Sequence, residues 1–78
     1  MKYFASYEVD GWHNAAPYVS HNKKKLLRDI REICIGEWTR GKIARFYVED
    51  EAGKTVYFGE ILPNGVIQYV TKNYVDKF

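Results

Sequence analysis

With 78 residues, the chain is long enough for one compact domain, 1–78, and too short to build a second core. Its composition, 46% hydrophobic and 28% charged, is ordinary for a globular protein and argues against a disordered chain. The net charge of +2 is too small to indicate a polyanionic partner by itself.

Three features of the sequence favour a soluble protein of the cytoplasm. Cys34 is the only cysteine, which excludes an internal disulfide, whereas small secreted domains usually carry an even set. The first residues, Met1 to Glu8, contain no long apolar run of the kind that marks a secretory signal. No stretch approaches the ~20 apolar residues that a membrane-spanning helix needs. We therefore expect no membrane partner.

Alternation of apolar and polar residues predicts a first strand at Lys2–Val9, followed by a turn at Asp10 and Gly11. The next stretch, Trp12–Val19, shows no clear period. Pro17 also disfavours a continuous helix there. We therefore expect an ordered loop between the first strand and the helix that follows it.

A helix is predicted to begin near Ser20 or Asn22, both favourable N-caps, and to run to about Ile35. Its apolar residues recur three and four positions apart and so share one face. They are Leu26, Leu27, Ile30, Ile33 and Cys34. Gly36 suits the position just after the helix, where a left-handed backbone often closes the last turn.

Three further strands are predicted at Lys42–Asp50, Lys54–Leu62 and Val66–Thr71, joined by glycine-containing turns at 50–53 and 63–65. The helix should pack on the side of the sheet lined by Ala44, Phe46, Val48, Val56, Phe58, Ile67 and Tyr69. The predicted fold is a two-layer α+β domain of order β-α-β-β-β, with one helix on a four-stranded, mainly antiparallel sheet. The place of the first strand stays open, because a helical crossover also permits a parallel neighbour.

One helix covers only one side of such a sheet, so the second side must meet water or a partner. Its predicted members are Arg45, Tyr47, Tyr57, Ile61 and Gln68. Tyrosines mixed with charged and polar residues are commoner at interfaces than on inert surfaces. We therefore expect a protein-interaction module, monomeric or homodimeric, that binds a protein through this side. The simpler interpretation is that the tyrosines only pair across strands.

The run Lys23-Lys24-Lys25 opens the predicted helix, where the macrodipole favours anions. With Arg28, these lysines and the unpaired backbone amides of the first turn form a plausible phosphate site. The alternative function is therefore nucleic-acid binding by this basic helix, with sheet tyrosines as stacking platforms. The simpler interpretation is a lysine-rich face that is merely solvated, as most such faces are.

No combination of residues predicts catalysis, a cofactor or a metal. His13 and His21 lack the spacing of metal ligands, and Cys34 lies far from the helix N-terminus that could activate it. The carboxylates Glu49–Glu51 fall at a hairpin tip, where acidic residues favour the turn itself. We therefore expect a protein that is not an enzyme, with no catalytic residue, no cofactor and no metal site.

The run Glu49–Val56, which follows a helix of mixed charge, resembles hairpins in many small phage and mobile-element proteins. The chain length and the plan of one helix on a sheet are similar to those of some phage inhibitors of host defence, including certain anti-CRISPR proteins. This resemblance is architectural, so it carries over no functional residues. It implies a protein that binds a host complex without catalysis.

Overall fold

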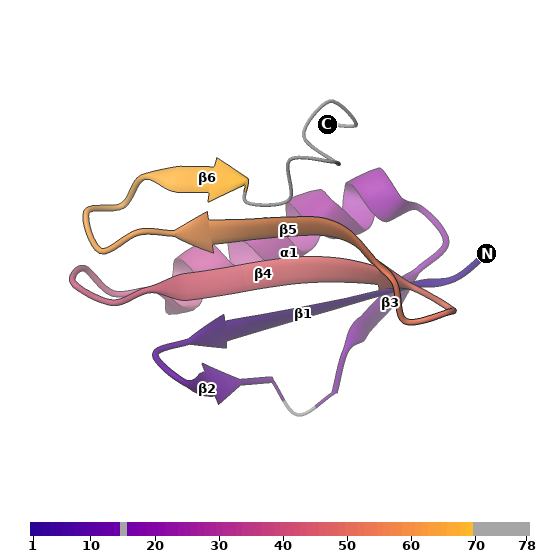
Figure 1. Ribbon diagram of the computed structural model, residues 1–78, viewed down its shortest axis with the longest axis horizontal. Helices are drawn as coiled ribbons and strands as arrows, with labels where there is room; N and C mark the ends of the chain where they lie inside the picture. Colours follow the sequence, from indigo (N-terminus) through magenta and orange to yellow (C-terminus); the bar gives the residue numbers. More distant parts are fainter. Residues whose placement is uncertain (15, 70–78) are drawn as a thin grey trace.

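In the described part of the computed structural model, one helix lies against one side of a six-stranded antiparallel sheet (Figure 1). The structure describes residues 1–14 and 16–69. Its elements are β1 (Tyr3–Val9), β2 (Trp12–His13), β3 (Tyr18–Ser20), α1 (Lys23–Glu37), β4 (Ala44–Asp50), β5 (Thr55–Ile61) and β6 (Ile67–Tyr69). The α+β class and the helix-on-sheet plan are confirmed, while the predicted count of four strands is wrong. The last two residues of the predicted strand Val66–Thr71 lie outside the described residues.

The two additional strands lie in the stretch predicted to be a loop. Asp10 and Gly11 both have positive φ, 51° and 85°, as a tight type I′ hairpin turn requires. This turn folds β2 back onto the end of β1, with Val9 opposite Trp12. After Pro17 the chain returns along the other half of β1 as β3. Each strand is too short to show a sequence period, so the pattern could not reveal it.

The strand order is β2-β1-β4-β5-β6, with β3 pairing the same edge of β1 as β2 does. β1 pairs in antiparallel fashion with β4 on one side and with β2 and β3 on the other. The first strand therefore lies inside the sheet rather than at its edge. This answers the question that the sequence left open. The N-terminal segment therefore supplies a central strand.

The helix begins where the sequence indicates and ends later. Asn22 is the N-cap, and its side chain accepts a hydrogen bond of 3.0 Å from the Lys25 backbone N–H. The expectation that Gly36 closes the helix is wrong, because α1 continues to Glu37. Its end is formed by Trp38, which is extended and donates its backbone N–H to the Cys34 carbonyl at 2.9 Å. No left-handed residue is needed at this end.

The core lies between α1 and the strands β1, β4 and β5. The helix packs directly on β1 and β4, which form the centre of the sheet. The buried apolar residues are Ala5, Tyr7, Leu26, Leu27, Ile30, Cys34, Ala44, Phe46, Val48, Tyr57 and Ile61. The helix face predicted from spacing is thus the buried one, apart from Ile33, which is only partly buried.

The two sides of β5 are exchanged relative to the prediction. Val48 lies opposite Tyr57, but the next residue, Glu49, lies opposite Thr55, so Val56 is an extra residue in a β-bulge. A shift of one residue turns every later side chain to the other side of the sheet. Phe58 therefore faces away from the helix, and Tyr57 faces it.

The bulge also sets Gly59 opposite Phe46, on the helix side of the sheet. Phe46 is fully buried, and its ring lies across the glycine. A Cβ atom on Gly59 would lie 2.5 Å from Cζ of Phe46, well inside van der Waals contact. The absence of a side chain at position 59 thus makes room for the ring of Phe46 on the buried side of β4.

Candidate binding surfaces

No described element covers the side of the sheet that faces away from α1, which is turned toward the viewer in Figure 1. Strand register and alternation assign to this open face Phe4, Ser6, Glu8, Arg45, Tyr47, Glu49, Thr55, Phe58, Glu60 and Gln68. Arg45, Tyr47 and Gln68 were predicted here, and the structure brings them together. Tyr57 and Ile61 were also predicted here, but both are 1% exposed beneath the helix. The bulge at Val56 is the reason.

A row of polar side chains crosses the open face from β1 to β6. Arg45 Nε donates to Glu60 Oε2 at 3.0 Å, and Arg45 Nη1 lies 3.8 Å from Glu8 Oε1. Gln68 Nε2 donates to Glu60 Oε1 at 3.2 Å. These residues occupy opposite positions on successive strands, so the register itself aligns them. These contacts already hold the side chain of Arg45 in one position. Binding a partner would therefore cost less side-chain entropy.

Beside this row lies an aromatic pair. Tyr47 and Phe58 are opposite each other on β4 and β5, with ring centroids 6.0 Å apart and an interplanar angle of 69°. Together with Glu8, Arg45, Glu49 and Thr55 they line a shallow hollow of about 210 Å³, the aromatic hollow. Partial burial, followed by the charges of Glu8 and Glu49, raises the pKa of the Tyr47 phenol. Alternation did not predict Phe58 on this face, because nothing in the pattern indicates the bulge.

The charges of the open face are mostly negative. Among the described residues assigned to this face, Glu8, Glu49 and Glu60 stand against one cation, Arg45, which leaves a net charge of −2. Glu49 has no ion-pair partner within residues 1–14 and 16–69. A phosphate backbone approaching Tyr47 would therefore meet repulsion.

The predicted basic residues lie on α1, in the other layer of the molecule. Lys25 Nζ lies 2.9 Å from Asp29, and Arg28 Nε lies 3.6 Å from the same carboxylate. The hydrogen bond from Lys25 lowers the pKa of Asp29. Lys23 Nζ lies 5.9 Å from the ring centroid of Tyr3. Three of the four predicted cations thus already have intramolecular partners.

A second hollow, of about 260 Å³, does bring some of the predicted residues together. Lys24, Arg28 and Arg31 surround it, and Leu27, Tyr57 and Tyr69 complete its lining. Arg31 Nη1 donates to the Tyr69 hydroxyl at 3.2 Å. Because the ring of Tyr57 is buried, it forms part of the wall and offers no face on which a base could stack. We name this site the basic hollow.

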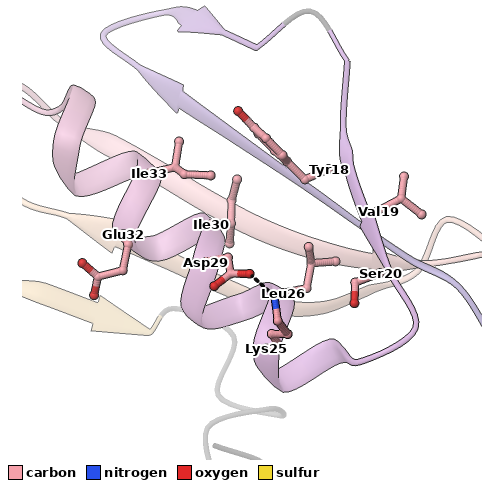
Figure 2. Close-up of a pocket in the computed structure, with 9 residues that line it drawn as sticks. All are labelled: Tyr18, Val19, Ser20, Lys25, Leu26, Asp29, Ile30, Glu32 and Ile33. Carbon is pink, nitrogen blue, oxygen red and sulfur yellow. Dashed lines mark hydrogen bonds and ion pairs between the residues drawn. The ribbon is translucent and has the colours of Figure 1, made fainter.

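A third hollow, of about 470 Å³, runs between β3 and α1 (Figure 2). Its apolar lining comes from Leu26, Ile30 and Ile33 of the helix, and Tyr18 lies across from them. The polar groups on its rim include Lys25 and Asp29, which bond each other. Neither histidine nor cysteine is among the described residues that line it.

No protein family, curated protein or solved structure that we searched matches this chain. The candidate surfaces therefore depend on the geometry of this chain alone.

The thiol of Cys34 lies in the core, away from the three hollows. Cys34 is fully buried, its Sγ lies 3.7 Å from the Arg45 carbonyl, and burial raises its pKa to about 12. It is therefore a protonated thiol packed in the core, as the sequence indicated. Within residues 1–14 and 16–69, no three His, Cys, Asp or Glu side chains are grouped to hold a metal ion. No described helix has the length and apolar character needed to cross a membrane.

Proposed function

We propose that the protein is a non-enzymatic interaction module that binds another protein through its open face. The observation that carries the proposal is the pairing of a pre-aligned polar row with the aromatic hollow on a side of the sheet that no described element covers. Interface centres are enriched in tyrosine, phenylalanine and arginine, and polar residues surround them. Arg45, Tyr47 and Phe58 provide this combination.

The charge of the open face supports a protein partner over a nucleic acid. Its net −2 disfavours phosphates, whereas a protein surface can present complementary cations. The basic residues that would attract phosphates lie in the helical layer, so Tyr47 and Lys23–Lys25 cannot act on one ligand from the same side. The basic helix is thereby separated from Tyr47, and the sheet tyrosines that lie beside it are Tyr57 and Tyr69 in the basic hollow.

Inhibition of a host defence complex is one instance of this class and remains part of the proposal. A small domain with one open face can block a larger complex by occupying its surface, without any reaction of its own. We place the protein in the cytoplasm as a monomer or homodimer, and its single buried cysteine suits a reducing compartment. Sedimentation equilibrium distinguishes the two oligomeric states.

The test compares capture of a partner by the wild-type protein and by the double variant Tyr47→Ser/Phe58→Ser. Loss of the cross-strand aromatic pair should cost about 1–2 kcal/mol, which leaves a small domain folded. A photo-crosslinking residue at Ser6 should label the partner in wild-type protein, and the double variant should lose it. The matched control is Trp12→Ser/Tyr18→Ser, which removes two exposed aromatics from β2 and β3.

Retention of the partner by the control, and its loss from a folded Tyr47→Ser/Phe58→Ser protein, is the expected pattern. If the folded double variant still captures the same partner, the open face is not the binding surface. Circular dichroism on each variant establishes that it is folded.

The alternative function is nucleic-acid binding at the basic hollow, favoured by the convergence of Lys24, Arg28 and Arg31. Binding to single strands should then weaken with salt, with a log–log slope of about −0.7 for each phosphate contact. Fluorescence titration of a mixed-sequence oligonucleotide at two salt concentrations tests this. Absence of binding at low salt removes the alternative.

A further inference from the structure

We propose that the aromatic hollow receives an arginine side chain of the protein partner, with its guanidinium between Glu8 and Glu49 and in contact with the rings of Tyr47 and Phe58. This inference rests on the proposed function, because it specifies what the partner must present to the open face. It also divides the open face into an anchor site and a surrounding rim.

The charges around the hollow select a cation. Arg45 lies 3.0 Å from Glu60, closer than the 3.8 Å to Glu8, so its charge is already matched by a carboxylate that does not line the hollow. Glu49 has no ion-pair partner in the described part of the chain. Glu8 and Glu49 both line the hollow beside the ring of Tyr47, and after burial their charges also raise the pKa of its phenol. An incoming cation would meet two carboxylates that the protein leaves incompletely neutralised.

The rings select the shape of that cation. Aromatic faces attract cations through the quadrupole of the ring, and arginine makes such contacts more often than lysine. The guanidinium is planar and weakly hydrated, so it stacks on a ring while donating in its own plane to carboxylates. The hollow of about 210 Å³ equals the volume of about seven waters at roughly 30 Å³ each, so one side chain can enter it.

The experiment is a titration of the isotope-labelled full chain with the peptide acetyl-Gly-Arg-Gly-amide, followed by NMR. Two peptides serve as comparisons: one with citrulline, which has the shape of arginine without its charge, and one with lysine. We expect shifts centred on Tyr47, Glu49 and Phe58, with the arginine peptide binding about tenfold more tightly than citrulline and about threefold more tightly than lysine.

The matched variants are Glu8→Gln/Glu49→Gln and Glu32→Gln. The first removes the carboxylates of the hollow and should weaken the arginine peptide about fivefold. The second removes a carboxylate that is 65% exposed on α1 and should change nothing. The comparison between arginine and citrulline on wild-type protein needs no variant, so it stands even if the double variant is poorly folded.

Equal binding of arginine and citrulline, shifts centred on α1, or unchanged affinity in Glu8→Gln/Glu49→Gln overturns the inference. Lysine binding as tightly as arginine overturns the assignment to a guanidinium. None of these results touches the proposed function, which depends on capture through Tyr47 and Phe58. If that capture fails while the arginine peptide binds as expected, the hollow is a cation site and the protein-binding proposal falls.

Discussion

Replacing Gly59 with alanine tests the packing that the β5 bulge creates. The new Cβ atom would lie 2.5 Å from Cζ and 2.8 Å from Cε2 of Phe46, whereas carbon atoms prefer about 3.5–4.0 Å. The ring must therefore move by about 1 Å, and it is fully buried, with Tyr69 packed edge-on at 6.2 Å. Overpacking of this kind costs about 1–3 kcal/mol, and a ring with no path to solvent lies toward the upper end.

A second effect acts in the opposite direction. Alanine restricts the unfolded chain more than glycine does, which favours the folded strand by roughly 0.5–1 kcal/mol. The clash outweighs this gain, so we expect Gly59→Ala to lower the free energy of unfolding by about 1–2 kcal/mol. For a domain of this size, the midpoint of thermal unfolding should fall by about 4–15 °C.

The assay is urea unfolding of the variant in two backgrounds, wild type and Phe46→Leu. Leucine lacks the ring atoms that the new Cβ meets, so Gly59→Ala should be nearly neutral there, and the coupling between the two sites should be about 1–2 kcal/mol. Gly36→Ala is the matched control: nothing lies within 4 Å of a Cβ at this helical position. It should gain about 0.5–1 kcal/mol. A loss below about 0.5 kcal/mol for Gly59→Ala, or the same loss in both backgrounds, would refute the reasoning.

Three other changes probe the core and the helix. Ile30→Ala, at a position with 0% exposure, should lower the free energy of unfolding by about 2–5 kcal/mol in urea melts. A loss below about 0.5 kcal/mol would show that Ile30 is not a core residue. Asn22→Ala removes the acceptor for the Lys25 N–H and should cost about 1 kcal/mol, whereas an unchanged melt would contradict its role as N-cap. The Cys34 pKa is about 12 in the folded protein against a reference of 9.0, so its stabilising contribution is complete below pH 9 and is lost as pH rises toward 12. Wild type should therefore lose more stability than Cys34→Ala across this range, and equal losses would contradict the burial of the thiol.

The helix and two of the long strands could be predicted because their patterns permit one solution. In β4 the residues at 44, 46 and 48 are apolar and fully buried, and Arg45 alternates with them. The turn before β5 was also evident, since Gly53 adopts a φ of 81° that other residues avoid. The start of α1 was predicted at Ser20 or Asn22, because either side chain can accept from a free N–H of the first turn, and Asn22 is the one that does.

The sides of β5 could not be predicted, because apolar residues occupy both of them. Val56 and Phe58 form one apolar set, and Tyr57 and Ile61 form another, so hydrophobicity alone cannot choose between them. The bulge makes the choice, and Gly59 was the one available signal, since a strand glycine often marks the close approach of a neighbour. The error placed Tyr57 and Ile61 in the candidate site and left Phe58 out of it.

The separation of charge between the two layers has a consequence for how a partner would approach. The helix carries five basic and three acidic residues, for a net charge of +2, and the open face carries −2. Among the described residues these two surfaces thus carry opposite charge, and the field of a basic protein would favour an approach that presents the open face. Most diffusional collisions fail because the molecules meet in the wrong orientation, and such pre-orientation raises the productive fraction. Association should accordingly slow as added salt shortens the distance over which these charges act.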